Sequence, residues 1–309
     1  MTERVGLGLV GVGKIARDQH LPALAASRQF SLLAAASRHA TVETVPTFRT
    51  LEAMLAATPA LKAVSLCTPP VARLDTARSA IAAGLHVMLE KPPGQTVAEV
   101  LDLQRRAADA HVSLFATWHS REAAGVAAVR SWLAQRQILQ VNIAWQEDVR
   151  VWHPGQCWLW EAGGLGVFDP GINALSIATL ILPQPLVVES ATLGFPENCQ
   201  APIVAELKLC HGNDRSVSAL FDFRHSGEER WDIEVKTDAG LLLLGRGGAS
   251  LHLDGQPQAL SASAEYSALY RRFADLIASG ESDVDLVPLQ LVADAFLCGR
   301  RALVERFDP

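Results

Sequence analysis

The sequence predicts an α/β protein, with a doubly wound parallel sheet followed by an α+β domain that has an open, mostly antiparallel sheet. Two observations predict this fold. Short apolar strands alternate with helical patterns to about residue 120, and short alternating strands then follow one another. A chain of 309 residues is long enough for two such domains. We therefore expect domains at 1–120 and 121–309.

Composition and charge limit the partners of the chain. Hydrophobic residues make up 49% and charged residues 19%, which is typical of a globular protein. The net charge of −6 and the absence of a basic stripe argue against nucleic-acid binding. Five cysteines form no C-x-x-C pair, which favours free thiols in a reducing compartment. The glycine-rich apolar stretch 5–13 lacks the features of a signal peptide, and no run is long enough to span a bilayer. We expect a cytoplasmic protein that does not enter membranes.

Two glycine fingerprints overlap near the start, in the stretch GLGLVGVGKIA. The first begins at Gly6 and spells G-x-G-x-x-G; the second consists of Gly11, Gly13 and Ala16 and spells G-x-G-x-x-A. Residues 5–10 have the pattern of a buried strand, and helical spacing begins after Gly13. The second fingerprint therefore lies at the strand-to-helix turn. There Gly11 permits the turn, Gly13 lets backbone approach a pyrophosphate, and the helix N-terminus supplies N–H donors.

The end of the second predicted strand, at 30–38, bears on the choice of cofactor. NAD sites usually carry an acidic residue there, which holds the ribose 2′-hydroxyl. Here the strand ends in Ser37 and Arg38, a hydroxyl and a guanidinium that suit a 2′-phosphate. We predict that NADP is the preferred cofactor and that NAD is also used.

Strands and helices continue to alternate through the first domain. They are expected at 49–57, 61–70, 71–83, 83–93, 96–110 and 111–119. Ligands gather at the carboxyl ends of the strands in such a sheet. Lys91 directly follows a buried strand and precedes Pro92, so it can donate to a substrate hydroxyl. The predicted cofactor site consists of Gly11, Gly13, Lys14, Ile15, Ser37, Arg38, Thr68, Pro69, Glu90 and Lys91.

Four motifs together resemble the glucose–fructose oxidoreductase/inositol dehydrogenase (Gfo/Idh/MocA) family. They are GVGKIA (11–16), TPP (68–70), EKP (90–92) and GGLGVFDPGIN (163–173). The resemblance implies a Rossmann domain followed by a domain whose large open sheet commonly forms the subunit interface. A homodimer or homotetramer through the C-terminal sheet is therefore expected. The resemblance also implies that Lys91 is a catalytic or substrate-binding residue.

The chain departs from the family pattern at two positions. Asn173 stands four residues after Asp169, where the family often has histidine, and Arg73 stands three residues after TPP, where it also often has histidine. An amide cannot act as a general base, so Asp169 is the nearest candidate proton acceptor. No function follows from Arg73. The Asp169–Asn173 pair, Ser37-Arg38 after the second strand and the tryptophan-rich loop at 147–173 most resemble the branch of the family that oxidises L-arabinose and D-galactose at C1.

The second half of the sequence predicts a mostly antiparallel sheet closed by two helices. Strands are expected at 141–148, 187–195, 203–211, 216–225 and 230–236, and helices at 264–279 and 286–306. Family likeness implies that the last helix packs on the first domain. The loop at 147–173 carries three tryptophans, and so long a loop in a compact chain is usually functional.

Tryptophan faces bind the C–H faces of sugars, while nearby polar groups bind the hydroxyls. The predicted substrate residues are His119, Glu147, Trp152, His153, Asp169, Asn173 and Trp231, whereas Trp158 and Trp160 are expected in the core. Asp169 followed by Pro170 is also a good N-cap and N1 pair, although capping alone would not explain Asn173 one turn later. The spacing of His119, Glu147 and His153 matches no metal-ligand pattern, so no metal is expected.

Together with the family resemblance, these residues predict an NAD(P)-dependent aldose 1-dehydrogenase acting on a small-molecule sugar. In this hypothesis Asp169 accepts the O1 proton, Lys91 orients the same oxygen, and Asn173 positions Asp169 or the sugar. Hydride leaves C1 and a lactone forms. Lys91 as the base, with Asp169 tuning it for that role, is an open alternative. Oxidation of another ring hydroxyl, as in an inositol dehydrogenase, and a silent NADP-binding sensor are open alternative functions.

Overall fold

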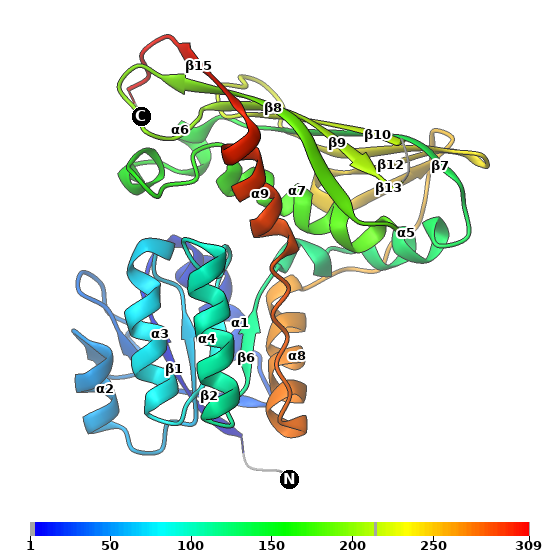
Figure 1. The fold of residues 1–309 in the computed structure, drawn as a ribbon. Coiled ribbons are helices and arrows are strands. Elements are labelled where there is room, and N and C mark those ends of the chain that lie inside the picture. Colours follow the sequence, from blue (N-terminus) through cyan, green and yellow to red (C-terminus); the bar gives the residue numbers. More distant parts are fainter. Residues whose placement is uncertain (1–3, 213–214, 309) are drawn as a thin grey trace. The chain divides into compact units, whose positions relative to one another are not determined.

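The computed structural model describes residues 4–212 and 215–308. The chain forms two compact units (Figure 1), each built from two segments of sequence. The first consists of Met1–His119 and Ala264–Leu286, and the second of Ser120–Ser263 and Val287–Pro309. A segment from near the end of the chain thus completes the first unit.

The first unit is built on a parallel sheet. Within the described residues this sheet has six strands in the order β3-β2-β1-β4-β5-β6, and every pair is parallel. The strands are β1 (Val5–Val10), β2 (Phe30–Ala36), β3 (Thr47–Phe48), β4 (Ala63–Leu66), β5 (His86–Leu89) and β6 (Leu114–Ala116). The direction of winding reverses between β1 and β4, which is where ligands bind in such sheets. The predicted doubly wound sheet is confirmed.

Helices cover both faces of this sheet. Helices α2 (Leu51–Ala57), α3 (Arg73–Ala82) and α4 (Val97–Asp109) pack on one face. Helices α1 (Leu21–Ala25) and α8 (Glu265–Ser279) pack on the other. The apolar side chains of α8 recur every three or four residues and form one stripe against the sheet, as an amphipathic helix requires.

The second unit is built on a larger, mixed sheet. Among the described residues its nine strands lie in the order β14-β13-β12-β11-β7-β10-β9-β8-β15. They are β7 (Ile138–Gln146), β8 (Leu186–Pro196), β9 (Val204–His211), β10 (Arg215–Asp222), β11 (Arg230–Thr237), β12 (Gly240–Gly245), β13 (Ser250–Leu253), β14 (Gln256–Pro257) and β15 (Arg300–Val304). Only β7 with β10, and β8 with β15, pair in parallel among these strands. The expected open, mostly antiparallel sheet is confirmed.

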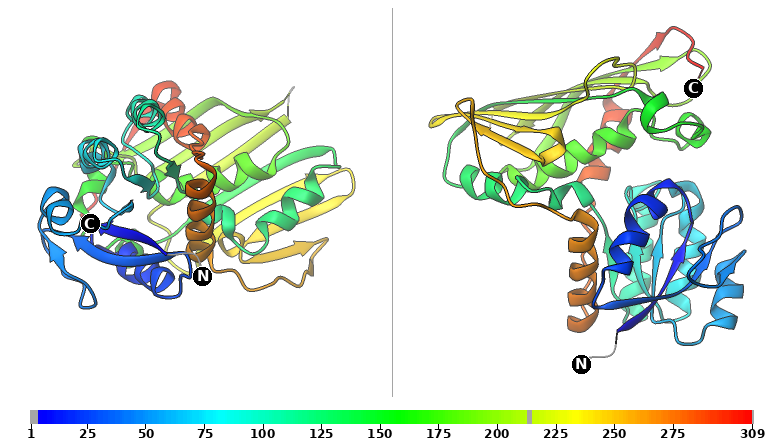
Figure 2. Two further views of the ribbon diagram at one scale, coloured as in Figure 1. Left: turned by 90° about the horizontal axis from the view of Figure 1, so that it is seen from below. Right: turned by 180° about the vertical axis from the view of Figure 1, so that it is seen from behind.

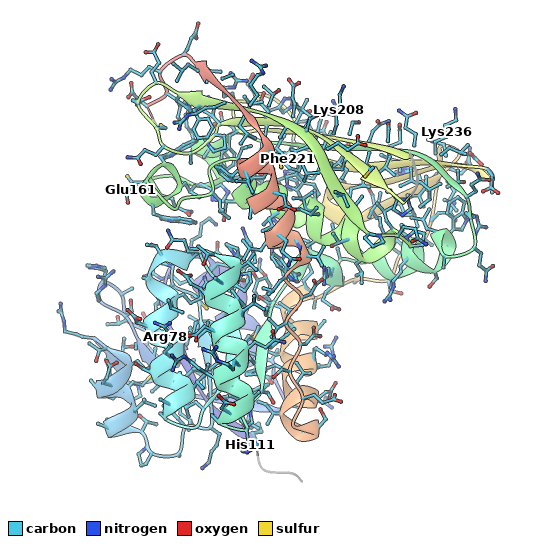
Figure 3. The ribbon with its side chains drawn as sticks, viewed as in Figure 1. Arg78, His111, Glu161, Lys208, Phe221 and Lys236 are labelled. Atoms are coloured by element: carbon cyan, nitrogen blue, oxygen red, sulfur yellow. The ribbon has the colours of Figure 1, made fainter. Side chains whose placement is uncertain are left out.

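Helices α5 (Val126–Leu133), α7 (Phe168–Ile181) and α9 (Val287–Cys298) cover one face of this second sheet (Figure 2). Strand residues alternate between that face and the opposite one. Phe221 of β10 is fully buried and packs on Phe168 of α7, with ring centroids 5.8 Å apart. Lys208 and Lys236 project from the opposite, exposed face (Figure 3).

Three expectations about helices are wrong. The last helix, α9, ends at Cys298 instead of 306 and packs on the second unit, while α8 is the helix that packs on the first. Gly299 follows α9 and the chain continues as the strand β15, as glycine after a helix allows. Helix α7 begins at Phe168 with Val167 as its N-cap, so Asp169 is not the cap. Asp169 N–H donates to the carbonyl of Gly166, and Asp169 lies inside the first turn of the helix.

Two further observations concern the residues that the structure describes. None of the helices in the described ranges is long and apolar enough to cross a membrane. All five cysteines lie in those ranges and are free thiols.

Candidate active site

The structure separates the two glycine fingerprints by their surroundings. Gly6 and Gly8 lie inside β1, where an added Cβ would lie 2.6 Å from the Ala60 carbonyl oxygen and 2.7 Å from Met54 Cε, respectively. Gly11 follows β1 with φ +91°, a conformation that favours glycine. A Cβ on Gly13 would meet nothing within 4 Å. The turn therefore leaves open space beside Gly13, as the approach of a dinucleotide phosphate requires.

The other predicted cofactor residues follow the carboxyl ends of neighbouring strands. Ser37 and Arg38 come directly after β2, and Arg38 is exposed. Thr68 and Pro69 follow β4, and Glu90 and Lys91 follow β5. Lys14 forms an exposed ion pair with Asp18 in the first turn of the following helical segment. These residues fit a dinucleotide site along one edge of the sheet.

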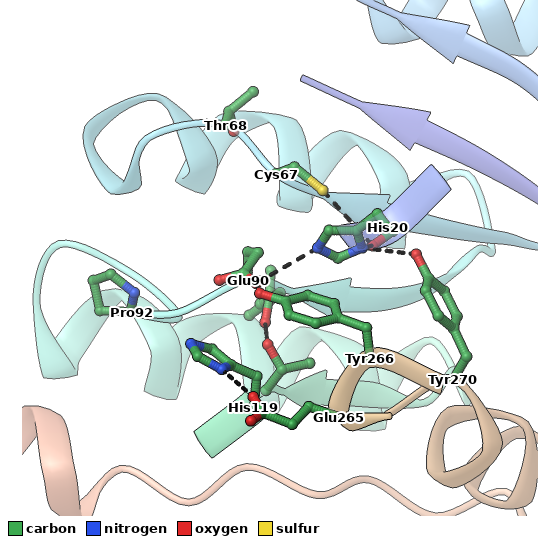
Figure 4. A network of polar contacts seen from close by, with 12 residues as sticks. His20, Cys67, Thr68, Glu90, Pro92, His119, Glu265, Tyr266 and Tyr270 are labelled. Carbon is green, nitrogen blue, oxygen red and sulfur yellow. Dashed lines mark hydrogen bonds and ion pairs between the residues drawn. The ribbon is translucent and has the colours of Figure 1, made fainter. Parts of the chain in front are cut away.

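Glu90 turns its side chain into the interior of the first unit and is only 3% exposed. Tyr266 donates a hydrogen bond to Glu90 Oε1, and His20 Nε2 lies 3.5 Å from the same oxygen (Figure 4). The other ring nitrogen of His20 lies 2.8 Å from the Tyr270 hydroxyl and 3.4 Å from Ser65 Oγ. This buried network joins η1 (Ala16–His20), the EKP segment and α8.

The network sets the charge of its two central groups. Burial disfavours the ionised form of Glu90, but the hydrogen bond and positive charge of His20, with support from His119 and Tyr266, lower the Glu90 pKa to about 2. Burial would likewise lower the pKa of His20. Its polar neighbours Cys67 and Tyr270, together with Glu90, instead raise the His20 pKa well above its usual value. The directions of both pKa shifts favour a buried imidazolium–carboxylate pair.

Sequence reasoning missed His20 and its tyrosine partners. A signal was present, because His20 lies four residues after Ala16 and four before Leu24 and so falls on the buried stripe of the first helical segment. The predicted substrate residue His119 also lies in the first unit. Its Nδ1 is 2.7 Å from Glu265 Oε2, and its ring stacks on Tyr266 with centroids 5.5 Å apart.

The second unit brings three of the predicted substrate residues together. Glu147 follows β7, His153 follows the short helix α6 (Val149–Trp152), and Asp169 lies in the first turn of α7. His153 Nε2 is 3.3 Å from Glu147 Oε1, and His153 Nδ1 is 3.8 Å from Asp169 Oδ2. Both carboxylates are only 4% exposed. An imidazole between two carboxylates can hold or pass a proton.

Two predicted tryptophans border this cluster. Trp231 Nε1 donates to Glu147 Oε2 at 2.8 Å, and Trp231 meets Trp152 edge to face with ring centroids 5.0 Å apart. Trp152 is 38% exposed and donates from its Nε1 to Glu229 Oε1 at 3.1 Å. The cluster thus combines acidic hydrogen-bonding groups with aromatic faces, the combination that suits a sugar.

The other residues considered in this region lie in different surroundings. Asn173 is half-buried on α7, one turn after Asp169. Trp160 is buried and packs on Phe223 and Phe307, as expected of a core residue, whereas Trp158 is half-buried. No group of three His, Cys, Asp or Glu side chains within residues 4–212 and 215–308 is arranged to hold a metal ion.

Comparison with known proteins identifies the family. The Gfo/Idh/MocA model, described as an oxidoreductase family with an NAD-binding Rossmann fold, matches residues 5–117. Galactose 1-dehydrogenase from Pseudomonas fluorescens is 47% identical over 304 residues, which cover 98% of each chain. The chain belongs to the Gfo/Idh/MocA family. It is therefore an oxidoreductase, and its first unit has the NAD-binding Rossmann fold of that family.

Two solved structures are similar to this chain. The crystal structure of a D-galactose-1-dehydrogenase from Rhizobium etli matches with a TM-score of 0.96 and 52% identity, covering 100% of this chain and 99% of that one. KijD10, a 3-ketoreductase from Actinomadura kijaniata solved with NADP and TDP-benzene, matches with a TM-score of 0.83, covering 98% of this chain and 100% of that one. At 18% identity, its likeness concerns the fold alone.

Proposed function

We propose that this chain is an NAD(P)-dependent aldose 1-dehydrogenase, which oxidises C1 of D-galactose or L-arabinose to the lactone. The observation that carries the proposal is the cluster of Glu147, His153 and Asp169 beside two tryptophan faces. The likeness to galactose 1-dehydrogenase over nearly the whole chain supports it. L-arabinose and D-galactose share the arrangement of their ring hydroxyls and differ by one hydroxymethyl group, so one pocket can accept both.

The division of roles follows the two units. The first unit binds the cofactor and supplies Lys91, and the second binds the sugar. In the second unit, Trp152 and Trp231 offer aromatic surface to the C–H faces of the pyranose. Glu147 accepts hydrogen bonds from the sugar hydroxyls, and His153 accepts or donates them.

The chemistry needs one proton acceptor and one hydride acceptor. Asp169 accepts the proton of O1, while Lys91 donates to the same oxygen and orients it. Asn173, one turn along α7, positions Asp169 or the sugar. The nicotinamide of the bound cofactor accepts the hydride from C1. His153, within 3.8 Å of Asp169, can receive the proton in turn.

NADP is the preferred cofactor in this proposal, with NAD also used. Arg38 is exposed directly after β2, and Ser37 adjoins it. A guanidinium forms charge-assisted hydrogen bonds with a 2′-phosphate, whereas it gains little from a neutral ribose hydroxyl. No acidic residue stands at this position.

The proposed assembly is a homodimer or homotetramer in the cytoplasm, formed through the exposed face of the second sheet. That face carries linked polar side chains: Ser218 donates to Asn142 Oδ1 at 2.8 Å, and Asn142 donates to Glu234 Oε1 at 3.2 Å. Light scattering of the purified chain tests this proposal, because a monomer at micromolar concentration would contradict it.

A panel of aldoses tests the proposed activity. NADPH absorbance is followed with each sugar, and the product is identified by NMR. D-galactose and L-arabinose should be oxidised with release of the lactone. A ketose-type product from a ring carbon other than C1 would instead indicate an inositol dehydrogenase-like activity, and no turnover with any sugar would indicate a sensor. Asp294→Asn, on an exposed position of α9, is a matched control for substitutions of Asp169.

A further inference from the structure

Arg73 is among the largest fully buried side chains of the described chain, with 2% exposure. It is the first residue of α3. Its Nη1 donates to the carbonyl oxygens of Glu90 and Pro92, and its Nη2 donates to the carbonyl oxygen of Thr68. Burying a guanidinium costs free energy unless its N–H groups have hydrogen-bond acceptors. The three backbone acceptors of Arg73 therefore indicate that it holds specific segments of the chain in place.

The three acceptors belong to two loops at one edge of the parallel sheet. Strands β4 and β5 are paired neighbours whose last residues, Leu66 and Leu89, lie opposite each other. Thr68 follows β4, whereas Glu90 and Pro92 follow β5 on either side of Lys91. Arg73 therefore holds the backbone immediately before and immediately after Lys91.

The backbone that Arg73 holds also contacts the glycine turn after β1. A Cβ on Gly11 would lie 2.8 Å from the backbone nitrogen of Thr68 and 3.0 Å from the carbonyl carbon of Cys67, so the turn after β1 rests directly on the backbone that Arg73 holds. One guanidinium thus fixes the turn after β4, on which Gly11 rests, relative to the segment that carries Lys91.

We propose that Arg73 is a positioning residue for catalysis, which acts through Lys91. The proposal rests on the proposed function of Lys91. A lysine side chain is long and rotates freely, so its amine reaches a fixed point only if its own backbone is fixed. The planar guanidinium fork reaches two loops at once, whereas a lysine at position 73 would offer a single ammonium point.

The test compares the wild-type chain with Arg73→Lys and Arg73→Gln. Arg73→Lys should lower kcat by about 10- to 100-fold, the cost of misplacing a catalytic group by about 1 Å. Its KM for the sugar should change much less, because the sugar-binding cluster lies in the second unit. The matched control is Arg78→Lys on the same helix, whose partners Asp75 and Asp102 are carboxylates of the helical surface. That control should retain the wild-type kcat.

A double-mutant cycle separates positioning from general stability. In a Lys91→Met background, Arg73→Lys should lower the residual kcat/KM by less than about twofold, because the group that Arg73 positions is already absent. Hydrogen exchange should become faster in peptides covering 68–72 and 90–94.

Several results would overturn the inference. They are wild-type kcat in Arg73→Lys, an equal fold-loss in both backgrounds, unchanged exchange in both peptides, or failure of both Arg73 variants to fold, which would assign the residue to stability alone. Failure of the proposed function is a different result. It appears in the wild-type chain as absence of aldose oxidation, and the exchange experiment then still tests the anchoring by Arg73.

Discussion

The substitution Glu90→Gln should destabilise the first unit strongly, although it changes little in size or shape. Glu90 is buried, and its pKa is about 2 instead of 4.5 because His20 and Tyr266 favour the charged form. At about 1.4 kcal/mol per pH unit, that difference corresponds to about 3 kcal/mol of stability at neutral pH. The variant leaves the His20 imidazole without its counter-charge, and breaking buried pairs costs a similar amount, about 3–5 kcal/mol.

Urea and thermal unfolding at pH 7 measure this loss. A loss of about 3 kcal/mol corresponds to a decrease of roughly 6–12 °C in Tm. Glu43→Gln, at an exposed position before β3, is the matched control and should remain within about 0.5 kcal/mol of wild type. The difference between wild type and Glu90→Gln should shrink as the pH falls from 4.5 toward 2, because the carboxylate is then lost. A Glu90→Gln variant as stable as the control at pH 7 would refute the charged pair.

Three further predictions concern pH, cofactor and substrate. The stability that Glu90 contributes is fully present above pH 4.5 and is lost as the pH falls through about 2. The stability that His20 contributes is fully present below pH 6.5 and is lost as the pH rises through its raised pKa. Thermal melts across pH should show both losses of stability in wild type and no acidic loss due to Glu90 in Glu90→Gln. Arg38→Asp should raise the Kd for NADP at least about tenfold more than the Kd for NAD, measured by fluorescence titration, and an equal loss for both would contradict the 2′-phosphate role. Trp231→Phe keeps an aromatic face but removes the donor to Glu147, so the sugar KM should rise about 5- to 20-fold with NADP affinity unchanged, and an unchanged KM would contradict the sugar-binding role.

Local sequence patterns predict the individual helices and strands of this fold better than they predict which elements pack together. Alternation of apolar strands with helices predicts the doubly wound sheet, because each parallel strand needs a crossover helix. The apolar stripe of α8 is equally visible in the sequence, yet nothing local shows that its residues Tyr266, Tyr270 and Phe273 complete the first unit from 150 residues beyond β6. The strand β15 lies inside the helix expected at 286–306, because the single glycine at 299 does not by itself show that the helix ends there.

The candidate site divides in the same way. Glu147, Trp152, His153, Asp169 and Trp231 can be selected from one unusual loop and a nearby strand, because their residue types suit a sugar. Their mutual contacts depend on how the segments after β7 and β10 meet, and spacing alone does not encode that. Arg73 could not be predicted to anchor two loops, because arginine is usually exposed and its acceptors are backbone carbonyls, which leave no mark in the sequence.

The central claim is that Asp169 accepts the proton during sugar oxidation. The most direct measurement is kcat for Asp169→Asn with D-galactose, taken together with the Kd for NADP and compared with Asp294→Asn. Loss of a general base lowers turnover by about 10²- to 10⁴-fold, and the NADP Kd should stay within about twofold of wild type. Turnover of Asp169→Asn within about threefold of the Asp294→Asn control would contradict the claim and leave this account without its proton acceptor.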